Sequence, residues 1–212
     1  MRLSSRVVFA DCVFNVSENV YEPAEDSFLF AENLRVRRGC KVVDMGTGCG
    51  ILGVIAAKKA DRVIAIDVNP YAVKCAKNNA ETNGVGNHMS FVQGDLFAPL
   101  RTRKEFDLIL FNAPYLPSEE NEKDSWMGWA WAGGVSGRNV IDRFLCKAPK
   151  YLRLGGEIML MQSTLSNVEQ TLRLLKERGF EANVIAKQDI PFFESIVLVR
   201  GALNSGSLET AK

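Results

Sequence analysis

Residues 41–53, KVVDMGTGCGILG, place a short apolar segment directly before a turn that contains four glycines in eight positions. Residues 41–45 have the length and composition of a buried strand, and the apolar, Ala-rich residues 54–59 after the glycines predict a helix. A strand, a glycine turn and a helix in this order form a ligand-binding loop in doubly wound α/β domains, because glycine lets the backbone approach a ligand closely.

The glycine spacing separates two classes of ligand. A dinucleotide fingerprint can be drawn from Gly48, Gly50 and Gly53, but its first glycine lies several residues past the strand. The register that starts at Gly46 follows the strand directly, with Asp44 just before it. A carboxylate there opposes a pyrophosphate and suits a ligand with a sulfonium and an ammonium group. The pattern Asp-x-Gly-x-Gly-x-Gly resembles motif I of class I S-adenosylmethionine-dependent methyltransferases.

A second predicted strand, residues 62–66, ends just before Asp67. An acidic residue about 20 positions beyond such glycines commonly binds ribose hydroxyls, and we expect that role for Asp67. Asn69 and Pro70 predict the N-cap and first residue of a helix that extends through residues 71–82.

The rest of the chain continues this alternation. Further strands are predicted at residues 89–93, 106–111, 156–161, 181–186 and 194–199, with helices between most of them. This alternation predicts an α/β fold with a doubly wound, mostly parallel sheet. The resemblance of the glycine turn to motif I implies the class I methyltransferase (Rossmann-like) type, with an antiparallel last strand. We expect one domain over residues 1–200, and a flexible tail over residues 201–212.

Three local patterns refine this prediction. Residues 1–20 contain two short apolar patches, which predict a strand pair or an arm. Residues 21–27 precede an amphipathic helix, and Glu25 and Asp26 there are interpreted as first-turn carboxylates that stabilise a helix start. Ser166 and Glu169 form a capping-box pattern for a later helix that Gly179 closes.

A second informative stretch is residues 106–115, FDLILFNAPY. Its apolar run is typical of a strand buried on both faces, and the chain leaves the carboxyl end of that strand at Asn112. Asn112 offers a carboxamide, Pro114 limits the direction of the Ala113 carbonyl, and Tyr115 offers a face for stacking. Together they suit a planar group that carries NH2, although Asn and Pro are also common turn residues.

Composition restricts the classes of function. Lys and Arg number 26 and Asp and Glu number 25, so the basic excess typical of nucleic-acid-binding proteins is absent. The five cysteines are scattered, which argues against a disulfide framework and a structural zinc site, and no metal site is expected. The apolar runs have strand length and are interrupted by charges, so we expect a cytoplasmic protein with no membrane segment.

The segment after Tyr115 is long for a connection and is therefore expected to be functional. It holds an acidic run, Glu119, Glu120 and Glu122, and then three tryptophans at positions 126, 129 and 131. We expect a lid over the pocket, with one or two tryptophans packed beneath it.

Five segments occur in an order that resembles the HemK-type protein-glutamine N5-methyltransferases, specifically the eukaryotic/archaeal release-factor branch. They are residues 21–27 (YEPAEDS), 44–48 (DMGTG), 67–70 (DVNP), 112–115 (NAPY) and 131–138 (WAGGVSGR). The resemblance covers nearly the whole chain. It implies N5-methylation of the glutamine in the Gly-Gly-Gln motif of a class I translation release factor, with S-adenosyl-L-methionine as methyl donor. It also implies a small zinc-binding activator subunit as a possible partner.

The resemblance also implies residue roles. Asp44 and Gly46 would line the methionine end of the cofactor, Ser27 would lie over it, Asp67 would bind the ribose, and Asp95 would meet the adenine amino group. Asn112 and the Ala113 carbonyl would accept the two amide N–H groups of the substrate. The full cofactor-binding set is Tyr21, Pro23, Ser27, Asp44, Gly46, Gly48, Asp67, Asp95 and Asn112, and the catalytic set is Asn112, Ala113, Pro114 and Tyr115. One departure is Ala113, where the family motif usually has proline; its carbonyl is retained.

Several alternatives stay open at this point. The same slot suits N6-adenine or guanine-N2 methylation of DNA or RNA. The acidic run suits a basic peptide and hence protein lysine methylation. A catalytically idle scaffold that binds a partner through the tryptophan segment is the non-enzyme alternative, and the glycine register makes a dehydrogenase the weakest one.

Overall fold

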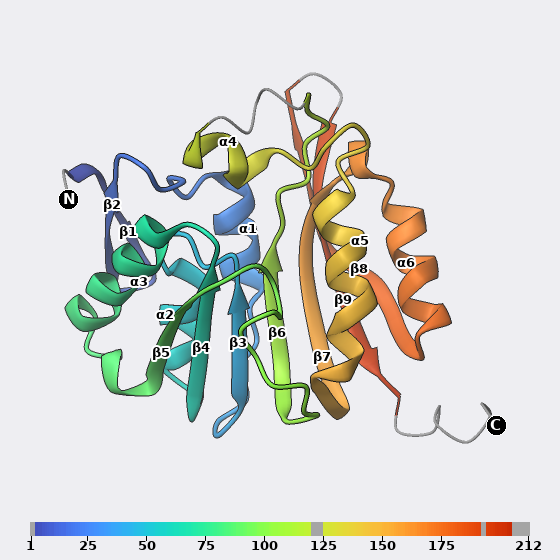
Figure 1. Ribbon diagram of the computed structural model, residues 1–212, viewed down its shortest axis with the longest axis horizontal. Helices are drawn as coiled ribbons and strands as arrows, with labels where there is room; N and C mark the ends of the chain where they lie inside the picture. Colours follow the sequence, from blue (N-terminus) through green and yellow to red (C-terminus); the bar gives the residue numbers. More distant parts are fainter. Residues whose placement is uncertain (1–2, 120–124, 192–193, 205–212) are drawn as a thin grey trace.

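A seven-stranded sheet forms the centre of the computed structural model, which describes residues 3–119, 125–191 and 194–204 (Figure 1). The strand order is β5-β4-β3-β6-β7-β9-β8. Strands β3 to β7 are mutually parallel, and β9 is antiparallel to β7 and β8. The bounds are Lys41–Met45 (β3), Arg62–Asp67 (β4), Met89–Gln93 (β5), Phe106–Asn112 (β6), Leu152–Ser163 (β7), Phe180–Ile190 (β8) and Glu194–Leu203 (β9). This arrangement confirms the predicted fold class.

Helices cover both faces of the sheet (Figure 1). One face packs against α1 (Glu25–Asn33), α2 (Ile51–Ala57) and α3 (Pro70–Thr82), and the other against α5 (Asn139–Lys147) and α6 (Val168–Glu177). Strand β6 shows why both faces are apolar: Leu108 and Leu110 belong to the first core, whereas Ile109 and Phe111 belong to the second. The short helix α4 (Trp126–Trp131) lies beyond the carboxyl ends of the strands.

An N-terminal hairpin, β1 (Leu3–Phe9) and β2 (Cys12–Ser17), confirms the predicted strand pair. It docks on α3 through two asparagines one helical turn apart. The side chain of Asn79 accepts from the N–H of Asn15 at 2.9 Å and donates to its carbonyl at 3.0 Å. Asn83 makes the same pair of bonds with Val13, at 2.9 and 2.8 Å. Asn79 also donates to the carbonyl of Cys49 at 2.8 Å, so one buried amide joins the hairpin, α3 and the glycine turn.

Two predicted boundaries need correction. Strand β9 continues through Leu203 because Ala202 pairs with Glu157 and Leu203 pairs with Phe180, so residues 201–203 belong to the sheet. Residues 205–212 of the predicted tail lie outside the described residues.

The N-cap of α6 is the second correction. Asn167 caps this helix, because its side chain accepts from the N–H of Gln170 at 3.0 Å. Ser166 is instead part of a short 3-10 turn and donates to the carbonyl of Ser163 at 2.8 Å.

None of the helices in the described ranges is long and apolar enough to span a bilayer.

We predict that Asn79→Ala lowers the free energy of unfolding by about 2–4 kcal/mol, because it removes the partner of the Asn15 N–H and of the Cys49 carbonyl. Denaturant titration measures the change. The matched control is Asn78→Ala, which removes an exposed amide from the same helix and is expected to change stability little. Equal effects of the two substitutions would contradict the role assigned to Asn79.

Candidate functional site

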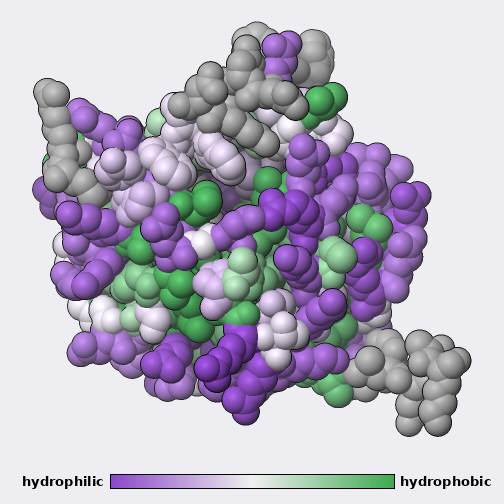
Figure 2. All heavy atoms as spheres, in the orientation of Figure 1, coloured by the Kyte–Doolittle hydropathy of each residue, from purple (hydrophilic) through white to green (hydrophobic). Residues whose placement is uncertain are grey.

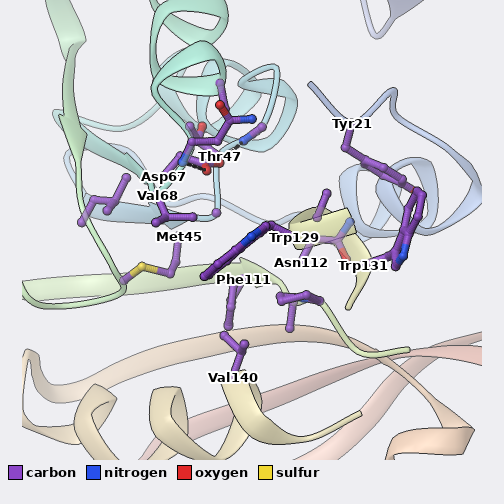
Figure 3. Close-up of a pocket in the computed structure, with 18 of the residues that line it drawn as sticks. Tyr21, Met45, Thr47, Asp67, Val68, Phe111, Asn112, Trp129, Trp131 and Val140 are labelled. Carbon is purple, nitrogen blue, oxygen red and sulfur yellow. Dashed lines mark hydrogen bonds between the residues drawn. The ribbon is translucent and has the colours of Figure 1, made fainter. Parts of the chain in front are cut away.

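A cavity of about 810 Å³ opens at the carboxyl ends of β3, β4 and β6, the edge where open α/β sheets bind ligands (Figure 3). It collects most of the residues that the sequence analysis singled out. Those lining it are Tyr21, Pro23, Ser27, Gly46, Gly48, Asp67, Asp95, Asn112, Ala113, Pro114 and Tyr115.

The glycine turn between β3 and α2 forms one wall. Gly46 and Gly48 have φ angles of +63° and +56°, a region that L side chains rarely adopt. The N–H of Gly48 donates to Asp67 at 2.9 Å, and the other oxygen of Asp67 accepts from the N–H of Asn69 at 2.9 Å. Through these two hydrogen bonds the Asp67 carboxylate joins the glycine turn to the end of β4 beside the cavity. Burial raises the pKa of this carboxyl group.

Asp44 is the main correction within the predicted cofactor set, because its side chain does not line the cavity. Alternation along β3 turns Val43 and Met45 towards the core beneath α5, so Asp44 faces the start of α2 instead. It accepts from the hydroxyl of Thr47 at 2.5 Å and from the N–H of Gly53 at 2.9 Å. Burial raises the pKa of Asp44 to about 7, although these two hydrogen bonds act in the opposite direction. Asp44 therefore supports the turn from below.

The opposite wall is organised by Asp26 of α1, whose side chain is buried. One oxygen accepts from the Nδ2 of Asn112 at 3.0 Å and from the hydroxyl of Tyr115 at 3.1 Å. The other accepts from the N–H of Ser27 at 2.6 Å and from the hydroxyl of Tyr21 at 3.3 Å. A single carboxylate thus connects α1, the segment before it and the end of β6.

This arrangement decides which way the Asn112 amide points. A carboxylate only accepts hydrogen bonds, so Asn112 must present its NH2 group to Asp26, and its Oδ1 faces away. Among the described residues, this buried Oδ1 has no hydrogen-bond partner. The structure therefore leaves an oriented, unsatisfied acceptor at a residue that lines the cavity.

Tyr21 and Tyr115 keep their protons in this setting. Burial raises the pKa of each phenol, and the negative charge of Asp26 raises it further. Both hydroxyls therefore remain donors to Asp26.

Sequence reasoning missed Asp26 as a site residue. A carboxylate in the first turn of a helix has a sufficient local explanation, and Asn112 lies 86 positions away in the chain. No local pattern connects the two residues.

Asp95 lies at the cavity, but its carboxylate forms an ion pair with Arg143 of α5. Both side chains are about half exposed, at 53% and 51%. The predicted contact of Asp95 with an adenine amino group therefore has Arg143 as a competitor, a residue that the sequence analysis did not single out.

The tryptophan segment reaches the cavity as a helix rather than as a loop (Figure 3). Ser125 caps this helix by accepting from the N–H of Gly128 at 3.1 Å. All three tryptophans line the cavity: Trp129 and Trp131 stay 46% and 39% exposed, whereas Trp126 is partly buried. Residues 120–122 of the acidic run lie outside the described residues.

Comparison with known proteins shows the family of this chain. The family model for the methyltransferase small domain matches residues 17–128. A putative protein N5-glutamine methyltransferase of Methanocaldococcus jannaschii is 43% identical over 181 residues, which cover 84% of this chain and 90% of the relative. Methyltransferase HEMK2 of Homo sapiens is 33% identical, with 77% of this chain and 80% of the relative covered.

The chain belongs to the HemK-type methyltransferase family. Among solved structures, the E. cuniculi Mtq2–Trm112 complex, described as responsible for methylation of the eRF1 termination factor, has a chain that matches with a TM-score of 0.68. That chain is 24% identical, and the match covers 88% of this chain and 99% of that one, which shows a shared fold.

As a HemK-type methyltransferase, the enzyme uses S-adenosylmethionine, and the cavity fits this cofactor. A volume of about 810 Å³ lies within the usual range of small-molecule sites. Asp67 would hold the ribose hydroxyls, and Ile66, Val68 and Leu96 provide apolar surface for a base. The carboxylates of Asp26 and Asp67 on the two walls suit a ligand that carries positive charge.

We predict that Asp26→Asn lowers kcat roughly tenfold to a hundredfold, the equivalent of one charge-assisted hydrogen bond, because an amide no longer forces Asn112 to present its NH2 group. Steady-state kinetics measures the loss of kcat, and calorimetry with S-adenosylhomocysteine measures separately the loss of cofactor affinity that is expected when a carboxylate is removed from the cavity wall. Glu25→Gln is the control, since it neutralises the adjacent exposed carboxylate. A kcat close to that of the wild type in Asp26→Asn would remove Asp26 from the site.

Proposed function

We propose that this enzyme transfers the methyl group of S-adenosylmethionine to N5 of the glutamine in the Gly-Gly-Gln motif of a class I translation release factor. The observation that supports this most is the unsatisfied Oδ1 of Asn112, held by Asp26 beside the Ala113 carbonyl and Tyr115. These groups suit a planar amide that donates two hydrogen bonds. Two similar proteins, a putative protein N5-glutamine methyltransferase and a complex described as responsible for methylation of eRF1, favour the same substrate. Translation termination takes place in the cytoplasm, where we place the enzyme.

The chemical difficulty of this reaction lies in the nucleophile. The lone pair of an amide nitrogen is delocalised, so the nitrogen attacks poorly unless it is held in line with the methyl group. When bound, the cofactor would supply that methyl on a sulfonium: the S–CH3 bond breaks as the N–CH3 bond forms, the sulfur becomes a neutral thioether, and the nitrogen loses one of its two protons. The protein positions the substrate amide. Asn112 Oδ1 and the Ala113 carbonyl accept hydrogen bonds from its two N–H groups, and Tyr115 packs on the amide plane. Hydrogen bonding to these acceptors also increases electron density on the nitrogen as it reacts.

The nucleic-acid alternative uses the same slot for an adenine or guanine amino group. The near balance of 26 basic and 25 acidic residues disfavours it, because a nucleic-acid substrate is usually met by a basic surface. A lysine substrate fits less well, since a flexible ammonium group is not planar.

A further part of the proposal is a small zinc-binding activator subunit, and the similarity to a chain of the Mtq2–Trm112 complex supports a protein partner. Strand β5 is at the edge of the sheet, and the connection from β5 to β6 contains no α-helix. Ile64, Val92 and Leu100 on this face are only partly buried, and Figure 2 shows apolar side chains gathered over β4 and β5. An open strand edge beside an apolar surface suits a partner that adds backbone hydrogen bonds.

To test the substrate, we predict label on the release factor from labelled S-adenosylmethionine and none on its glutamine-to-alanine variant, duplex DNA or ribosomal RNA. Mass spectrometry locates the added methyl group. Asn112→Ala is expected to lower turnover at least a hundredfold, because the amide loses an oriented acceptor. Label on DNA or RNA without label on the release factor would establish the nucleic-acid alternative instead.

To test the partner surface, we predict that Val92→Glu prevents co-purification with a Trm112-type zinc-binding protein, because a charge cannot be buried against apolar surface without a partner. Val184→Glu is the control: it places the same charge on β8, at the opposite edge of the sheet, where Val184 is 38% exposed. Co-purification that survives Val92→Glu would exclude the β5 face as the interface.

A further inference from the structure

Residues 133–138 (GGVSGR), the second part of the signature, have no role in the site described so far, yet they pack directly on residues 112–115, the catalytic loop. Leu116 donates to the carbonyl of Trp131 at 3.0 Å and accepts from the N–H of Gly133 at 2.8 Å. Ser118 donates to the carbonyl of Gly134 at 3.0 Å, and its side chain accepts from the N–H of Gly134 at 3.0 Å. Four hydrogen bonds therefore fasten this turn to the chain immediately after Tyr115.

Gly137 lies directly against the backbone of Tyr115 in the catalytic loop. A Cβ atom at this position would overlap the carbonyl oxygen of Tyr115 and would lie 3.1 Å from the Cβ of Ser166. The φ angle of Gly137 is +69°, so a side chain is also disfavoured by the backbone conformation. Gly137 is thus held between the catalytic loop on one side and Ser166 on the other.

The Ser166 side of this arrangement is rigid. Arg138, which is 4% exposed, donates to the carbonyls of Ser166 and Asn167 and to the hydroxyl of Thr171. Its guanidinium also pairs with Asp142 at 2.7 Å. The amide of Gln162 donates to the hydroxyl of Ser166 at 3.1 Å. Because these groups are buried and connected, an added atom at Gly137 must displace Tyr115 rather than Ser166.

We propose that residues 133–137 form a positioning platform for the catalytic loop, with Gly137 setting the backbone position of Tyr115. This inference rests on the proposed function in one respect, the assignment of Asn112–Tyr115 as the loop that holds the acceptor group. Displacing the Tyr115 backbone moves the Tyr115 hydroxyl relative to Asp26. It also shifts the carbonyl of Ala113, which lies two residues before Tyr115. The platform therefore acts on the geometry of the methyl acceptor and leaves the glycine turn of the cofactor site in place.

The test compares Gly137→Ala with Gly155→Ala. Gly155 has nearly the same φ, +71°, but a Cβ there meets nothing within 4 Å, so the control carries the backbone strain without the overlap. We expect Gly137→Ala to lower kcat roughly tenfold to a hundredfold, because a small displacement of an orienting group has effects of that size. In Gly137→Ala, the KM for S-adenosylmethionine and the affinity for S-adenosylhomocysteine should stay close to those of the wild type. Gly155→Ala should retain wild-type kcat.

A second pair of variants avoids steric overlap and keeps the test decisive if Gly137→Ala does not fold. Ser118→Ala removes the hydroxyl that accepts from Gly134 and should lower kcat several-fold, whereas Ser118→Thr retains a hydroxyl and should restore it. Wild-type kcat in both Gly137→Ala and Ser118→Ala, or equal losses in Gly155→Ala, would overturn the platform. If the wild type labels a substrate other than glutamine, the proposed function fails, but the same kcat comparison on that substrate still decides the role of Gly137.

Discussion

The hydrogen bonds from Asn112 and Tyr115 to Asp26 are the interaction on which the rest of the site depends. Asp26 lies on α1 and Asn112 ends β6, so this contact closes one wall of the cavity across two distant segments. A buried carboxylate that receives several donors holds each of them in one orientation, because it has no proton of its own to offer. The direction of the Asn112 Oδ1 follows from that constraint.

This arrangement has an energetic cost that points to a ligand. A buried acceptor without a partner, such as Asn112 Oδ1, destabilises the fold by about 1–3 kcal/mol. Burial also raises the pKa of Asp67 at the cavity wall, because desolvation outweighs the hydrogen bonds that its carboxylate accepts from backbone N–H groups. An amide that donates to Asn112 and a cofactor that carries positive charge would relieve both conditions.

Several residues that do not line the cavity hold the residues that do. Asn79 joins the N-terminal hairpin to the glycine turn through the Cys49 carbonyl, and Asp44 holds the same turn from below. On the acceptor side, Gly137 packs on Tyr115. The glycine turn and the loop of residues 112–115 thus each have supports outside the cavity, whereas Asp26 connects residues of the predicted cofactor set with those of the acceptor set.

The sequence by itself determined the succession of strands and helices along the chain, the glycine turn, and the places of Asp67, Asn112 and Tyr115 at strand ends, because periodicity and turn chemistry act over a few neighbouring residues. Only the tertiary structure decided how side chains from distant segments meet. It turned Asp44 away from the cavity, paired Asp95 with Arg143, and joined Asp26 to Asn112 across 86 positions. Such pairings depend on which faces the packed elements present to each other, and no local pattern in the chain records that choice.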